Sequence, residues 1–261
     1  MRRLIRRILR RIYLEDFARD FLSTLRRTRC SILRTRWSIL WHIQRDLAGT
    51  DRNIIDDYFK EHGIRKLHIG CGPNVLHGWL NSDYYPQSAQ ILHLDATEPF
   101  PFKNDEFDYV FSEHMIEHIT YSQGSHMLAE CHRVLKPTGK VRIATPDLSF
   151  LIDLYGSDKS DLQKDYIKWA TNRFISTAPY YEDTFVINNF VRDWGHKFIY
   201  DEKTLRYSLE KAGFTGIVKR YLSDNEDHEL RDLENEGRMP PGFLRLESIV
   251  LEGTKPLQDG S

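Results

Sequence analysis

The glycine turn Gly70-Cys71-Gly72 is the first group of residues in this sequence that could perform chemistry. It follows directly on Lys66–Ile69, a short apolar stretch with the pattern of a buried strand. Glycines at a strand end let the backbone turn sharply and let a ligand approach main-chain N–H groups. The turn therefore predicts a ligand site, although an ordinary turn after a strand has the same local pattern.

An aspartate follows the glycine turn at short range. Asp83 ends the next apolar stretch, Trp79–Asp83, where a carboxylate can accept two hydrogen bonds from a ribose diol. Only ten residues separate Gly72 from Asp83, fewer than a parallel crossover normally needs. Either the first helix is reduced to a turn, or the chain reaches Asp83 by an irregular path.

The run from His114 to His118 admits a different chemistry. It fits H-x-x-E-H, the inverted zinc-protease pattern, with Glu117 as its acid. On a helix, the two histidines would share one face, as zinc requires. The run follows Tyr109–Phe111 directly, however, and the sequence identifies no third ligand. We therefore expect no metal site and keep a zinc hydrolase as a remote alternative.

The elements that must position these residues alternate between strand and helix. The predicted strands are Lys66–Ile69, Trp79–Asn81, Ile91–His93, Phe107–Phe111, Val141–Ala144, Ile217–Tyr221 and Ser248–Glu252. The predicted helices are Glu113–His118, Ser125–Leu135, Asp161–Phe174 and Asp201–Ala212. This alternation predicts an α/β fold with a mostly parallel sheet and an antiparallel final pair of strands. Residues 147–200 form a long insertion with 12 aromatic residues, which favours a substrate cap.

Basic and acidic residues are unevenly distributed along the chain. Residues 1–60 carry a net charge of +8 and the remainder −9, although the whole chain has only −1. An acidic body is a poor nucleic-acid binder, so no nucleic acid is expected. The three separated cysteines favour a reducing compartment, and no apolar run is long enough for a signal or a membrane span. We expect a cytoplasmic protein.

The basic end of the chain, residues 1–50, is predicted to be an amphipathic helical extension. Six arginines stand among its first eleven residues, with Ile and Leu at the other positions of the helical pattern. Such a helix can rest on an anionic membrane surface through residues 1–36, placing the protein at the inner membrane face. Docking on the acidic body, a partner protein, nucleic acid or targeting remain the alternatives.

The complete series of motifs resembles class I S-adenosylmethionine (SAM)-dependent methyltransferases of the small-molecule "type 11" branch, over roughly residues 60–255. Its pieces are Ile69–Pro73, Asp95-Ala96 with Pro101-Phe102, Phe107-Asp108, and Arg133–Gly139. Gly78–Asp83 and Trp194–Phe198 resemble a bacterial sub-branch linked to surface-polysaccharide or sugar modification.

The resemblance implies a doubly wound Rossmann-like sheet of seven strands, mostly parallel with an antiparallel last strand, over residues 51–261. It implies SAM as cofactor and a hydroxyl of a small molecule or glycan-linked acceptor as methyl acceptor. The implied cofactor residues are Gly70, Cys71, Gly72, Asp83, Asp95, Ala96 and Glu113. Asp95 would accept a hydrogen bond from the adenine amino group, and His114 and His196 are the candidate general bases. A SAM- or nucleotide-binding module without catalysis is the alternative.

Overall fold

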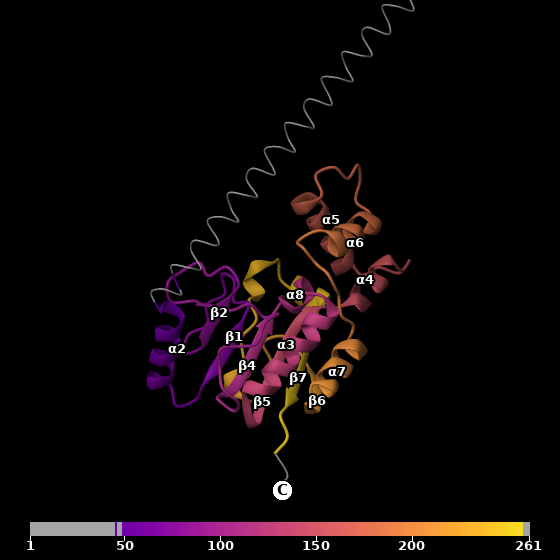
Figure 1. Cartoon of the computed structure of the whole chain (residues 1–261). Coiled ribbons are helices and arrows are strands. Elements are labelled where there is room, and N and C mark those ends of the chain that lie inside the picture. Colours follow the sequence, from indigo (N-terminus) through magenta and orange to yellow (C-terminus); the bar gives the residue numbers. More distant parts are fainter. Residues whose placement is uncertain (1–44, 46–48, 258–261) are drawn as a thin grey trace, which may run out of the picture. The chain divides into compact units, whose positions relative to one another are not determined.

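The computed structural model describes Arg45 and residues 49–257 (Figure 1). Most of the predicted basic extension, including all of residues 1–36, lies outside the described residues. Within the unit formed by residues 1–53, the guanidinium of Arg45 pairs with the carboxylate of Asp51. Among the described helices, none is both long and apolar enough to cross a membrane.

The second unit, residues 54–261, is built on one seven-stranded sheet with the order β3-β2-β1-β4-β5-β7-β6. The strands are β1 Lys66–Ile69, β2 Leu80–Asp83, β3 Leu92–His93, β4 Phe107–Glu113, β5 Leu135–Pro146, β6 Thr215–Arg220 and β7 Ser248–Thr254. The first five strands run parallel, and β7 runs antiparallel to both β5 and β6. The predicted fold class is confirmed in strand order and direction.

The crossover from β1 to β2 contains turns and no helix. β1 and β2 are nevertheless parallel neighbours, with Ile69 opposite Ser82. Of the two paths that the short spacing allowed, the chain takes the one in which the first helix is reduced to turns. Asp83 is thereby brought next to the glycine turn that precedes it.

One face of the sheet is covered by helices. These are α2 Thr50–Glu61, α3 Tyr121–Val134 and α7 Glu202–Lys211. Their apolar residues from Ile54 onward form one buried cluster with strand residues such as Leu67, Val110 and Val141. Helix α3 begins at a capping box, in which the Thr120 and Gln123 side chains satisfy each other's backbone N–H groups. Burial of this face is the main apolar contribution to the fold.

The other face of the sheet combines buried ion pairs with smaller apolar clusters and is covered by the segment between β6 and β7, residues 221–243. Alternate strand residues point to this face, because side chains in a strand alternate sides. Lys66 pairs with Glu229 at 2.6 Å, and Lys140 with Asp227 at 2.7 Å. The buried Arg142 bonds Glu234 at 2.6 Å and Glu252 at 2.5 Å. Ion pairs between strand residues and this segment, together with apolar contacts of Leu230 and Leu233 on Phe111 and Trp79, thus take the place of a layer of α-helices.

The predicted insertion, residues 147–200, forms three helices with a small apolar core of their own. They are α4 Leu148–Tyr155, α5 Asp161–Phe174 and α6 Asp183–Arg192, and they group together in Figure 1. Buried aromatic residues of these helices, among them Tyr166 and Phe190, pack with Phe243 of α8 (Phe243–Glu247). The sequence predicted α5 at its observed bounds and missed α4 and α6.

We expect Arg142→Met to lower the free energy of unfolding by about 3–5 kcal/mol, because it leaves the buried carboxylate of Glu234 without its cation and leaves Glu252 with Arg220 alone. Urea unfolding measures this loss. The matched control is Arg245→Met, which removes an exposed pair with Glu236 and should cost under about 1 kcal/mol. Equal losses in the two variants would contradict the structural role of Arg142.

Candidate functional site

The carboxyl ends of the parallel strands meet at one edge of the sheet and enclose a cavity of about 650 Å³. The lining includes six predicted site residues: Gly70, Gly72, Asp83, Asp95, Ala96 and His114. Tyr84, Tyr85 and Leu94 add aromatic and apolar surface beside the two aspartates. The sequence motifs therefore converge on one cavity, although they are spread over 45 positions of the chain.

The backbone at Gly70 accepts no side chain. Its φ is +71°, in the left-handed region that favours glycine. A Cβ built there would lie 2.4 Å from Cγ and 2.7 Å from Cβ of Met115, which follows β4. The end of β1 can approach the end of β4 this closely only because residue 70 is glycine.

Both aspartates of the cavity are held by backbone groups. Asp83 Oδ2 accepts a hydrogen bond from the Gly72 N–H at 2.9 Å, and its Oδ1 accepts one from the Tyr85 N–H at 2.7 Å. Asp95 Oδ1 accepts bonds from the N–H and the hydroxyl of Thr97 at 2.9 and 2.6 Å. A carboxylate has about four acceptor positions, so each remains able to bind a ligand donor.

The remaining predicted cofactor residues, Cys71 and Glu113, do not line this cavity. The Cys71 side chain is buried, and burial raises the pKa of its thiol to about 12. Glu113 accepts a hydrogen bond from the Asn235 N–H at 3.2 Å and pairs with Arg238 at 3.5 Å. Burial raises the pKa of Glu113. The structure places both residues in the support around the cavity.

The helix predicted over Glu113–His118 is wrong. β4 continues through Glu113, His114 adopts φ +47°, and the short 3-10 helix η1 covers only Ile116–His118. A non-glycine residue in the left-handed region costs about 1–2 kcal/mol, which the surrounding contacts must offset. The zinc-protease arrangement on one helical face is therefore absent from this segment.

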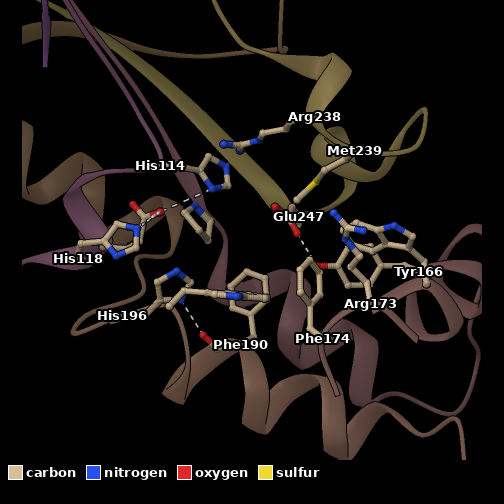
Figure 2. A pocket seen from close by; sticks show the side chains of 14 residues that line it. His114, His118, Tyr166, Arg173, Phe174, Phe190, His196, Arg238, Met239 and Glu247 are labelled. Atoms are coloured by element: carbon tan, nitrogen blue, oxygen red, sulfur yellow. Dashed lines mark hydrogen bonds and ion pairs between the residues drawn. The ribbon is translucent and has the colours of Figure 1, made fainter. Parts of the chain in front are cut away.

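A second cavity, of about 340 Å³, is drawn in Figure 2. It adjoins the first cavity. Helices α5 and α6 contribute aromatic residues, and the segment before β7 contributes Arg238, Met239 and Glu247. His114 and His118 line both cavities. These two imidazoles thus form part of the wall between the cavities.

His196, the other predicted catalytic residue, lines only the second cavity. Its Nδ1 lies 2.6 Å from the carbonyl oxygen of Phe190, and its ring centroid lies 5.0 Å from that of His118. Trp194, two residues earlier, has φ +59°. A strained turn therefore brings His196 to His118, 78 positions away in the sequence.

Burial controls the charge of the second cavity. It lowers the pKa of His114 well below the usual value, and it also lowers those of His118 and His196. These imidazoles are neutral near pH 7 and can accept protons. Burial raises the pKa of Glu117 to about 8 and that of Glu247 to about 7.

The prediction from sequence missed Arg238 and Glu247 as residues of the site, and treated Glu117 only as part of the zinc pattern. Glu247 accepts a hydrogen bond from the Tyr166 hydroxyl across the second cavity. Both Arg238 and Glu247 come from the segment after β6, which offers no motif. The available signal was the position of Glu247, an acid directly after the mostly apolar run Phe243–Leu246 and directly before the last strand.

The family comparison concerns the middle of the chain. Residues 79–143 match the family model of a methyltransferase domain. This range contains Asp83, Asp95 and the run from His114 to His118. A comparison with curated proteins found no match.

Several solved structures are similar to the chain. A SAM-dependent methyltransferase from Archaeoglobus fulgidus is 16% identical, with a TM-score of 0.45, over 81% of this chain and 94% of that one. A possible histamine N-methyltransferase from Thermotoga maritima is 19% identical, with a TM-score of 0.41, over 73% and 82%. The phosphoethanolamine N-methyltransferase 2 of Haemonchus contortus, in complex with SAM, is 17% identical, with a TM-score of 0.40, over 75% and 49%.

We expect the burial of Glu247 to make stability fall with rising pH. A carboxyl group whose pKa is raised on folding contributes stability that is fully present below its unfolded value, near 4.5, and is lost as the pH rises through about 7. Glu247→Gln should therefore lose less unfolding free energy between about pH 5 and pH 8 than the wild type. Denaturant unfolding at both pH values measures the difference.

Glu236→Gln is the matched control. Hydrogen bonds from Arg245 lower the pKa of Glu236. Its contribution to the free energy of unfolding is therefore present at higher pH and is lost as the pH falls, opposite to that of Glu247. An unchanged pH dependence in Glu247→Gln would show that Glu247 is ionised in the folded protein.

Proposed function

We propose that this chain is a SAM-dependent methyltransferase that acts on a hydroxyl of a small molecule or glycan-linked acceptor. The observation that carries the proposal is the pair of adjoining cavities with His114 and His118 in their common wall. Methyl transfer requires donor and acceptor to meet in line, and positioning alone supplies up to about 7–11 kcal/mol. Two cavities that meet at a common wall suit that requirement.

The first cavity fits SAM by its donor and acceptor groups. Gly70 leaves the backbone open to close approach, and Asp83 suits a ribose diol. Asp95 suits the adenine amino group, and Ala96 offers apolar contact beside it. When bound, SAM supplies an electrophilic methyl group.

The second cavity suits an acceptor with both apolar and anionic or hydroxyl-bearing parts. Trp169, Phe174 and Trp194 present aromatic surface, on which the C–H face of a sugar ring can pack. Arg173 and Arg238 present cationic groups in the same cavity. We assign residues 147–200 as the substrate cap, because α5 and α6 supply most of this aromatic surface.

His196 is the proton acceptor that this arrangement favours. Its Nδ1 faces the Phe190 carbonyl oxygen, which orients the ring and leaves Nε2 as the basic nitrogen. That nitrogen would take the proton of the acceptor hydroxyl, whose oxygen would receive the methyl group as its bond to the sulfur of SAM breaks and S-adenosylhomocysteine is released. General-base catalysis of this kind contributes about 10²–10⁴-fold. His114 Nε2 lies 2.7 Å from the Ser248 hydroxyl, which fixes the ring in the wall.

We expect calorimetry to show one equivalent of S-adenosylhomocysteine bound with micromolar-range affinity, and radiolabelled SAM to transfer its methyl group in an acceptor screen. Gly70→Val should abolish binding, because a side chain there meets Met115. The matched control is Gly63→Ala, where a Cβ meets nothing within 4 Å. Thermal unfolding checks that each variant folds.

Asp95→Ala tests the same site without crowding the backbone. It should weaken binding by about 1.5–3 kcal/mol, the value of a charge-assisted hydrogen bond. Undiminished affinity in a folded Gly70→Val protein would refute the cofactor site. Cofactor binding without transfer to any acceptor would instead favour a binding module without catalysis.

We also propose that residues 1–36 bring the enzyme to an anionic membrane surface. Each basic residue near such a surface contributes roughly 1 kcal/mol, and six arginines occur in the first eleven positions. The full-length protein should sediment with anionic vesicles, less so at high salt. Replacing these arginines by glutamine should abolish sedimentation, while neutral vesicles serve as control. A wild-type protein that stays in the supernatant at low salt would exclude this proposal.

A further inference from the structure

Three side chains that can each ligate a metal ion converge on the wall of the second cavity (Figure 2). One ligand atom each of Glu117, His118 and His196 lies within 4.8 Å of the other two. Glu117 Oε1 and His118 Nε2 are 3.8 Å apart. Atoms bound to one zinc-like ion at 2.0–2.2 Å are roughly 3–4 Å from one another. Small side-chain rotations would bring all three to one ion.

Glu117 supplies a second and independent observation. Its side chain is fully buried, and its Oε1 has no hydrogen-bond partner among the described residues. His114 and His118 approach this oxygen only to 3.6 and 3.8 Å, beyond hydrogen-bond range. The other oxygen, Oε2, accepts a bond from the Thr145 hydroxyl at 3.1 Å. A buried acceptor without a partner is costly, and a cation beside it removes that cost.

The two histidines are oriented as metal ligands usually are. Metal-binding histidines commonly donate the N–H of one ring nitrogen to a carbonyl or carboxylate, which leaves the other nitrogen for the ion. His196 Nδ1 lies 2.6 Å from the Phe190 carbonyl oxygen. The His118 ring has a hydrogen bond with the backbone of Trp194, and its Nε2 faces Glu117. Both rings therefore keep one nitrogen available.

The backbone holds these residues together. The carbonyl oxygen of Glu117 accepts hydrogen bonds from the N–H groups of Lys197 and Phe198 at 2.8 and 3.2 Å. This contact fastens η1 to the turn that carries His196. The positive charge of Arg238, which also lines this cavity, is paired with Glu113 at 3.5 Å. No described cation is paired with the Glu117 carboxylate.

We propose that Glu117, His118 and His196 bind a divalent transition-metal ion of the zinc type. Two imidazoles and one carboxylate are a ligand set known for catalytic zinc, and such sites keep a further position open. His118 and His196 line the second cavity, so the open position faces it. If the proposed function holds, the ligand there is an oxygen atom of the acceptor, and His196, whose Nε2 is then bound to the ion, is not the proton acceptor of the metal-loaded enzyme.

The test uses full-length protein freed of metal by a chelator. Calorimetric titration with Zn²⁺ should show one tight equivalent, and Co²⁺ should give visible absorption bands of a nitrogen- and oxygen-ligated ion. Glu117→Gln and His196→Asn should each weaken binding by at least about 100-fold, because loss of a ligand exceeds the 10–100-fold effect of losing an outer partner. The exposed His77→Asn is the matched control and should bind as the wild type does.

The outcomes separate this proposal from the proposed function. Absence of a tight equivalent in the wild type, or equal affinity in the wild type and a folded His196→Asn, overturns the metal site. His196 is half-exposed, so this variant carries the test if Glu117→Gln fails to fold. Titration of wild-type, metal-free protein with S-adenosylhomocysteine tests the cofactor site separately. Failure of one site therefore leaves the other still testable.

Discussion

The buried guanidinium of Arg142 holds the segment 221–243 against one face of the sheet. Arg142 lies in the middle of β5 with no exposed surface, and its partners Glu234 and Glu252 come from a loop and from β7. A cation in this position requires carboxylates, since burial of an unpaired charge costs several kcal/mol. The segment 221–243 is thereby fixed on the sheet without a helix. Four residues beyond Glu234, the same segment places Arg238 in the second cavity.

The parallel register of β1, β4 and β5 determines the rest of the site. Ile69 lies opposite Ser112, and Glu113 lies opposite Ala144. The three strands therefore end at the same edge of the sheet. Residues that follow these strands line the two cavities: the glycine turn after β1, the His114–His118 run after β4, and residues of the helical insertion after β5. The close contact of Gly70 with Met115 is a local result of this register. The two cavities meet because β4, which leads into His114, lies between β1 and β5.

Local patterns were sufficient to predict where the strands lie along the chain, because periodicity and glycine turns act over a few residues, whereas the doubly wound sheet was implied by the family resemblance. Asp83 and Asp95 were identified in the same way, as acids that follow apolar stretches. The buried ion pairs on the other face of the sheet could not be predicted, because the pairing of Arg142 with Glu234 spans 92 positions. The proximity of His196 to Glu117 could not be predicted either, because these two residues also lie far apart in the sequence. The helix expected at Glu113–His118 was wrong because strand pairing with β5 prevailed over local helical pattern.

The shared wall of two imidazoles has a thermodynamic consequence. A ligand in one cavity that shifts His114 or His118 alters the surface that the other cavity offers. Any resulting change in affinity must be reciprocal, since the coupling free energy is common to both ligands. Donor and acceptor affinities are then linked quantities, and each constant has meaning only at a stated concentration of the other ligand.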